Sequence, residues 1–197
     1  MNYIAHLHIA QHCHSDLLGN FLGDFIKGQN YVGLPQRLVV GIKLHRQVDV
    51  YTDQHPAVVA LRAQFSPSIR RVAGIVIDIV FDHLLLYHWS KFANYPAEQL
   101  FSSFYTQLAS FNQAVSPHFQ GLSDSLIRQQ WLTNYHQRSS CLRAFKGIER
   151  RLHGKISFAD EAQAFVDAQF EHFETTFLAF YPELLEHALH CNTKLQG

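Results

Sequence analysis

The sequence has few cysteines, no net charge and none of the common catalytic motifs. Its three cysteines, Cys13, Cys141 and Cys191, are far apart and form no C-x-x-C pair. This argues against a disulfide framework or a thiolate zinc site and is typical of a reducing compartment. Basic and acidic residues balance at 16 each, so no overall field favours nucleic acid or a membrane surface. We therefore expect a cytoplasmic protein that binds neither nucleic acid nor membrane.

Export and membrane signals are also missing. The N-terminus has no basic stretch, and His6, His8 and His12 interrupt any apolar core, so the sequence predicts no signal peptide. Asp78 and Asp82 break the one apolar run that approaches membrane-spanning length. There is no G-x-S-x-G, glycine-rich phosphate loop, H-E-x-x-H or E-x-x-H. These absences argue against a serine hydrolase, a P-loop enzyme, a zincin and a di-iron bundle.

The sequence does contain a succession of apolar stretches with helical periodicity. Hydrophobic residues make up 47% of the 197 residues, enough for one sizeable core. No segment alternates convincingly as a strand, so we predict a single all-α domain over residues 1–197. Its main helices, about eight in number, are expected over residues 2–12, 15–28, 35–54, 69–92, 96–115, 124–137, 140–153 and 157–180. Two short helices are expected over residues 57–65 and from Pro182 onward, and a loop around Ser116, Pro117 and Gly121.

The most informative stretch runs from Gly74 to Trp89 and reads G-I-V-I-D-I-V-F-D-H-L-L-L-Y-H-W. Its length and apolar character predict a buried helix. Asp78 and Asp82 are four residues apart and share a face of this helix. Ionised carboxylates in an apolar helix are costly unless they are paired or bound to a metal. We therefore expect a positive charge against this pair, from a metal ion or from a nearby arginine or lysine.

Pairs of polar residues at i,i+4 recur in the first half of the chain. They are Asn20/Asp24, His45/Asp49 and Asp78/Asp82, and they are joined by His6, His8 and His83. The spacing lets one helix supply two metal ligands, and a mixed set of imidazoles and carboxylates suits Mn, Fe, Zn or Mg. Water on such a metal becomes a nucleophile near neutral pH.

Each of these residues also has a plainer interpretation. His45 and Asp49 would then form an exposed helical ion pair of small energetic value. Asp24 would pair with Lys27, and His83 would neutralise Asp78 or Asp82. Under this interpretation the chain is a helical binding module without catalytic activity.

Basic residues gather in one region of the second half. They are Arg138, Arg143, Lys146, Arg150, Arg151 and Lys155, and an acidic stretch follows over residues 160–186. Two interpretations stand side by side: the basic and acidic helix faces pair with each other, or the basic residues form a surface for an acidic partner.

Four blocks of the sequence resemble the acyl carrier protein phosphodiesterase family. They are N-Y-I-A-H-L-H-I-A, G-N-F-L-G-D-F-I-K-G, G-I-K-L-H-R-Q-V-D-V-Y-T-D and D-I-V-F-D-H-L-L-L-Y-H-W. The resemblance covers essentially the whole chain and is most specific over residues 2–92. It implies an HD-like helical bundle and a divalent metal, manganese above all, with magnesium or iron as other options. The implied reaction splits the phosphodiester of holo acyl carrier protein into apo protein and free 4'-phosphopantetheine.

The resemblance also implies roles for individual residues. The metal ligands would be Asp24, His45, Asp49, Asp78 and Asp82. The catalytic residues would be Asp24, His45, Asp82, His83, His6 and Arg46, with His6 or His83 protonating the leaving serine oxygen and Arg46 or Lys27 stabilising the phosphoryl oxygens.

The resemblance bears on the partner as well. Acyl carrier protein is acidic, so the basic residues from Arg138 to Lys155 would be its docking surface, with Arg37, Arg70 and Arg71 as alternatives. The sequence departs from HD enzymes in one respect, because it has no contiguous His-Asp and Asp82-His83 is reversed. A metal phosphohydrolase of nucleotides or other small phosphoesters is the alternative activity.

Overall fold

The computed structural model describes residues 1–152 and 156–197. Within these residues the chain forms eleven α-helices and two short 3-10 helices, with no strand, which confirms the predicted all-α fold. The helices are α1 (Tyr3–His12), α2 (Leu17–Leu22), α3 (Gln36–Gln54), α4 (Pro56–Ala63), η1 (Arg70–Val72), α5 (Ala73–Tyr87), α6 (Trp89–Phe92), α7 (Ala97–Ser110), α8 (Pro117–Gln129), η2 (Trp131–His136), α9 (Ser139–Arg151), α10 (Ala159–Ala168) and α11 (Phe170–Gln196).

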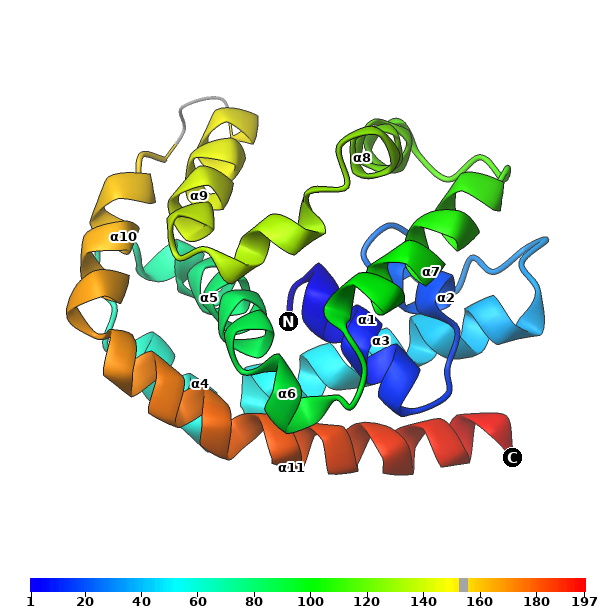
Figure 1. The fold of residues 1–197 in the computed structure, drawn as a ribbon, viewed down its shortest axis with the longest axis horizontal. Helices are drawn as coiled ribbons and strands as arrows, with labels where there is room; N and C mark the ends of the chain where they lie inside the picture. The colour runs from blue at the N-terminus through cyan, green and yellow to red at the C-terminus, as the bar shows by residue number, and fades with distance from the viewer. Residues whose placement is uncertain (153–155) are drawn as a thin grey trace.

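Helix α1 lies at the centre of the fold (Figure 1). Its residues from Ile4 to Ala10 are all buried, so every face of the helix is covered. It contacts α2, α3, α5, α7 and α11. Helices α3 and α11 run along one side of the molecule, and α8 and α9 stand on the opposite side. A polar residue on α1 is therefore enclosed by protein on all sides unless a cavity reaches it.

Helix α2 packs against α3 unusually closely, because glycines face each other where they cross. A Cβ atom on Gly41 would lie 2.8 Å from the Cα atom of Gly19, so only glycine fits at this contact. The predicted helix over residues 15–28 is shorter than expected. Asp16, and not Ser15, caps it by accepting a hydrogen bond from the Gly19 N–H at 2.8 Å. The chain leaves the helix after Leu22.

The predicted buried helix over residues 69–92 is present but divided. Helix α5 forms its centre, η1 precedes it, and α6 follows after a break at His88. None of the helices in the described residues combines the length and apolar character needed to cross a membrane.

Several boundaries in the second half differ from the predictions. The helix predicted over residues 96–115 ends at Ser110, and the one predicted over residues 157–180 is divided at Gln169 into α10 and the start of α11. Ser116 and Pro117 begin α8, because the Ser116 hydroxyl accepts a hydrogen bond from the Phe119 N–H and proline suits the first helical turn. The segment predicted as helix over residues 124–137 therefore contains the end of α8 and then η2. Pro182 lies inside α11 and does not begin a helix. The predicted end of the helix at residues 153–154, and Lys155, lie outside the described residues.

Candidate functional site

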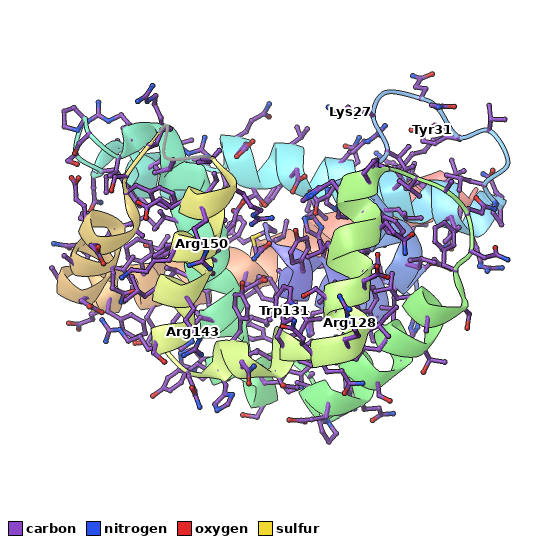
Figure 2. All side chains as sticks on the ribbon, turned by 90° about the horizontal axis from the view of Figure 1, so that it is seen from above. Lys27, Tyr31, Arg128, Trp131, Arg143 and Arg150 are labelled. Carbon is purple, nitrogen blue, oxygen red and sulfur yellow. The ribbon has the colours of Figure 1, made fainter. Side chains whose placement is uncertain are left out.

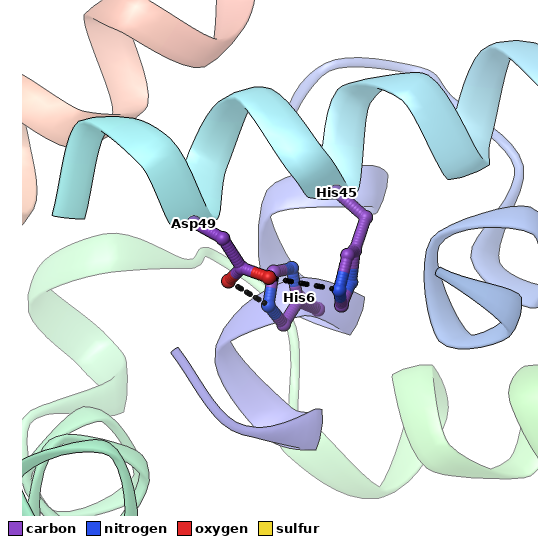
Figure 3. A group of neighbouring side chains, drawn as sticks. All are labelled: His6, His45 and Asp49. Carbon is purple, nitrogen blue, oxygen red and sulfur yellow. Dashed lines mark hydrogen bonds and ion pairs between the residues drawn. The ribbon is translucent and has the colours of Figure 1, made fainter. Parts of the chain in front are cut away.

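Two histidines and one aspartate meet between α1 and α3 (Figure 3). His6 Nε2 lies 3.1 Å from Asp49 Oδ1, and His45 Nε2 lies 3.0 Å from Asp49 Oδ2. The two imidazole rings stack with their centroids 3.8 Å apart. One ligand atom from each of the three residues lies within 4.8 Å of the others. We call these three residues the His–Asp cluster.

The local sequence explains how the cluster is built. His45 and Asp49 are four residues apart on α3, so both side chains leave the helix on the face that meets His6. Gly23, directly after α2, makes room for the His45 ring. A Cβ atom at Gly23 would lie 2.2 Å from His45 Cγ, so any larger residue would displace the ring.

Two more aspartates flank the cluster toward solvent. Asp24 Oδ1 lies 3.6 Å from His45 Nε2, and the Asp24 side chain is 41% exposed. Asp78 Oδ1 lies 3.2 Å from the Met1 amino nitrogen, which in turn lies 3.4 Å from Asp49 Oδ1. The structure therefore brings five of the predicted site residues into one neighbourhood: His6, Asp24, His45, Asp49 and Asp78.

Burial and neighbouring charges set the protonation of the cluster. Burial, and then the proximity of His45, lower the pKa of His6 to about 3. Burial opposes ionisation of Asp49, but His6, His45 and the Met1 amino group outweigh it and hold the pKa of Asp49 below its ordinary range. At neutral pH His6 is therefore a neutral imidazole beside an anionic carboxylate, and these are the forms that bind metal ions.

The donor set fits a divalent metal ion. Imidazole nitrogens together with carboxylate oxygens suit Mn, Fe and Zn. The Nδ1 atoms of His6 and His45 are buried and have no hydrogen-bond partner among the described residues. Each ring therefore has its Nε2 nitrogen beside Asp49 and its Nδ1 nitrogen without a partner among the described residues. The two Nε2 nitrogens and the Asp49 oxygens lie close together, and they form the donor set that a metal ion would meet.

Comparison with known proteins places this chain among relatives of one kind. The family model described as acyl carrier protein phosphodiesterase matches residues 1–184. The chain belongs to the acyl carrier protein phosphodiesterase family. A relative of that name from Photorhabdus laumondii is 36% identical over 189 residues, which cover 95% of each chain. Another from Escherichia coli is 33% identical over 191 residues, which cover 96% of this chain and 98% of the relative. No solved structure matches.

In this acyl carrier protein phosphodiesterase family member, Asp82 lies outside the His–Asp cluster. It is fully buried, and its two oxygens accept hydrogen bonds from the backbone N–H groups of Ile4 and Ala5, each at 2.9 Å. Because the first N–H groups of a helix lack partners within the helix and carry partial positive charge, the carboxylate caps α1. Burial raises the pKa of Asp82 to about 7, although the two hydrogen bonds oppose this.

The positive partners of the two acids on α5 thus differ from the sequence-based expectation. Asp82 is matched by the N-terminus of α1, and Asp78 by the Met1 amino group. Burial disfavours the charged amino group, but Asp78 and Asp49 outweigh it and raise its pKa to about 10. The charge of the Met1 amino group also acts on Asp82, where it lowers the pKa and so opposes the effect of burial.

Two other predicted residues point to different partners. The Nδ1 atom of His83 lies 2.7 Å from the backbone oxygen of Tyr135, within a buried setting that lowers the pKa of His83. Arg46 donates hydrogen bonds to the backbone oxygens of Gly28 and Ile26 and to the Tyr31 hydroxyl at 2.8 Å. Its guanidinium fastens the segment between α2 and α3, so this family member does not direct Arg46 to the cluster.

Two cavities lie beside the surroundings of the cluster in this family member, and neither has His6, His45 or Asp49 in its lining. The smaller, about 270 Å³, is lined by Met1, Asp24 and Asp78 of the cluster's surroundings. The larger, about 700 Å³, shares Asn2, Tyr3, Ile79, His118 and Ile148 with it. The sequence does not indicate His118. This residue follows Pro117 in a segment predicted as a loop, and no polar residue at helical spacing from it suggests a site.

Proposed function

We propose that this protein hydrolyses the phosphodiester that joins 4'-phosphopantetheine to the serine of holo acyl carrier protein. The products are apo acyl carrier protein and free 4'-phosphopantetheine. Family membership over residues 1–184 carries the proposal, because both relatives described above are named for this phosphodiesterase activity. The smaller cavity supports it, because Asp24 and Asp78, which flank the cluster, line that cavity and hydrolysis needs polar groups that substrate can reach.

A divalent metal, with manganese preferred and magnesium or iron as alternatives, is part of the proposal. His6, His45 and Asp49 would hold it, with Asp24 as the fourth protein ligand nearest to His45. When bound, such an ion lowers the pKa of a coordinated water and polarises a phosphoryl oxygen. Asp49 would contribute its negative charge, and the two imidazoles would contribute the nitrogens that face it.

The remaining groups would handle the proton and the departing alcohol. Water attacks phosphorus, the bond from phosphorus to the serine oxygen breaks, and that oxygen takes up a proton. His118 is the one histidine in the described lining of both cavities, so we assign the proton transfer to it. This replaces His6 and His83 in that role, since His6 is hydrogen-bonded to Asp49 and His83 to Tyr135.

Purified protein incubated with holo acyl carrier protein and manganese tests the proposal. The carrier protein should lose the mass of its 4'-phosphopantetheine group, and that group should appear free in solution. Asp49→Ala and His45→Ala should each lower kcat at least a hundredfold, because each removes a group at the centre of the site. Wild-type protein that leaves holo carrier protein intact but cleaves free nucleotides would instead support the small-phosphoester activity.

A further inference from the structure

A groove runs between α8 and α9, on the side of the molecule opposite to α11. Figure 2 shows the two helices facing each other, with Trp131 of η2 between them and Arg143 and Arg150 on α9. The groove is the larger of the two cavities, about 700 Å³, which is a volume typical of sites for small organic ligands. Leu122, Trp131 and Ile148 provide apolar surface within it.

The charged residues that line the groove are all of one sign. They are Arg143, Arg150 and Arg151, and no aspartate or glutamate lines it among the described residues. None of the three has a salt-bridge partner in the described part of the chain, so the groove presents positive charge that no acidic group among those residues pairs with.

The structure divides the predicted basic cluster into two parts. Arg138 Nη2 lies 2.8 Å from Asp167 Oδ1, and Lys146 Nζ lies 3.2 Å from Asp160 Oδ1. These two residues follow the interpretation that the basic and acidic helices pair with each other. The three groove arginines agree with the other interpretation, in which basic residues form a positive surface for an anionic partner.

The groove is continuous with the His–Asp cluster's surroundings. Asn2, Tyr3 and Ile148 line both the groove and the smaller cavity, which also contains Asp24. Burial, and then the negative charge of Asp24, raise the pKa of Tyr3 to about 12, while nearby Arg151 opposes this rise. Tyr3 lines both cavities, whereas Asp24 lines only the smaller one and Arg151 only the groove, so Tyr3 lies where the two cavities meet.

Each wall of the groove carries a glycine in the interior of its helix. A Cβ atom on Gly121 of α8 would meet nothing within 4 Å, and one on Gly147 of α9 would meet only Arg150 Nη2 at 3.9 Å. Helix packing therefore does not require glycine at either position, although glycine weakens a helix interior. Side chains at both positions would extend into the groove and reduce its width.

We propose that this groove binds the pantetheine arm of the substrate, an inference that rests on the proposed function. The arm is a chain of amides with a branched apolar segment, and a phosphate anion is attached at one end. The phosphate end lies at Tyr3, where the groove meets the smaller cavity, with Arg151 beside it. The amide chain then runs between α8 and α9 over Trp131 and Ile148. This orientation delivers the phosphorus toward Asp24 and the cluster.

Narrowing the groove without touching the cluster tests the inference. Gly121→Leu and Gly147→Leu should each lower kcat/KM for holo acyl carrier protein at least tenfold. Hydrolysis of bis(p-nitrophenyl) phosphate, a phosphodiester without the arm, should stay within twofold of wild type. Ala164→Leu adds a leucine side chain at an exposed position of α10 that does not line the groove, so it is the matched control and should retain activity on both substrates.

Binding of free 4'-phosphopantetheine, followed by thermal shift, decides the same question without turnover. Wild type should be stabilised by this compound but not by equal inorganic phosphate, and both leucine variants should lose the shift. The inference would be overturned if both leucine variants kept the wild-type thermal shift with 4'-phosphopantetheine and the wild-type kcat/KM. It would also be overturned if AMP raised the melting temperature of wild type and 4'-phosphopantetheine did not. Failure of wild type to cleave holo carrier protein would instead contradict the proposed function. The thermal shift with 4'-phosphopantetheine would still show whether the groove binds this compound.

Discussion

The carboxylate of Asp82 accepts a hydrogen bond from the backbone N–H of Ile4 at 2.9 Å, across 78 residues of sequence. Its other oxygen accepts from Ala5 at the same distance. Since His6 follows directly, the contact fixes the first turn of α1 and with it the position of the His6 ring. Asp82 thus positions the cluster from a distance, with one N–H group of α1 on each of its oxygens.

Asp82→Ala should therefore act on stability more than on metal binding. It leaves two buried N–H groups without partners, each costing roughly 1–3 kcal/mol, so the free energy of unfolding should fall by about 2–6 kcal/mol. Urea unfolding measures the loss, and the milder Asp82→Asn retains one acceptor and should lose less. Manganese should still raise the melting temperature of Asp82→Asn, and the absence of any such increase would return Asp82 to the metal ligands.

Gly23→Ala should disable the site while leaving the fold intact. The added Cβ would lie 2.2 Å from His45 Cγ, so the ring must move away from Asp49. We expect kcat/KM for holo carrier protein to fall at least tenfold, with a circular dichroism spectrum like that of wild type. Gly121→Ala is the comparison, because its added methyl group meets open space. Equal activity of the two variants would mean that the His45 position does not matter for the reaction.

Metal addition should stabilise wild type through His6 and not through His83. An ion that binds only the native state raises its stability by about 2.7 kcal/mol at a hundred times Kd. Manganese added to chelator-treated protein should raise the melting temperature of wild type and of His83→Gln alike. His6→Gln should show little or no increase. A shift that survives in His6→Gln but disappears in His83→Gln would move the metal to the α5 residues.

The cluster was predictable where its residues share a helix. His45 and Asp49 are four residues apart on a mostly apolar background, and this spacing predicts that they share one face of α3. The partners of the buried acids on α5 were harder to predict. The apolar sequence around Asp82 indicates that this carboxylate needs a positive partner, but it does not indicate which group provides it. That partner is the end of a helix 78 residues earlier in the sequence, a tertiary contact that no local pattern encodes.

The predicted helix boundaries were wrong where tertiary packing outweighs the local preference of the sequence. A proline inside a helix removes a backbone hydrogen bond and costs about 3 kcal/mol, so Pro182 was read as the start of a new helix. It lies within α11 next to Phe180, Tyr181 and Leu184, all of which are buried. Apolar burial on both sides of the proline holds the helix together through it, and the sequence alone does not reveal how much surface that face covers.

Arginines of the same basic stretch should differ in their effect on activity. Arg151→Gln and Arg143→Gln should each lower kcat/KM for holo carrier protein severalfold, because both line the groove and lack an acidic partner among the described residues. Arg138→Gln should have little effect, since Arg138 is paired with Asp167 and does not line the groove. Steady-state kinetics at low salt measures all three, because salt screens such charges. Equal losses in all three would indicate a general effect of positive charge.

Stability at mildly acidic pH should depend on His8. Its ring is buried, with Nδ1 2.9 Å from the Tyr181 hydroxyl and Nε2 3.2 Å from the backbone oxygen of Phe92. Burial lowers the pKa of His8 from 6.5 to about 4, although the hydrogen bond to Phe92 opposes this. Between these values the unfolded chain binds a proton that the folded chain does not, so stability falls as pH decreases from about 6.5 to 4.

The size of this effect follows from the pKa difference and amounts to about 3 kcal/mol across the window. His6 has a lowered pKa of the same sign, so the wild-type pH dependence contains both contributions. His8→Gln preserves one donor and one acceptor but cannot titrate there. Its unfolding free energy, measured in urea from pH 7 to 4, should therefore decline less steeply than that of wild type. Parallel curves for the two proteins would show that His8 is already protonated in the folded state, which its hydrogen bonds and burial oppose.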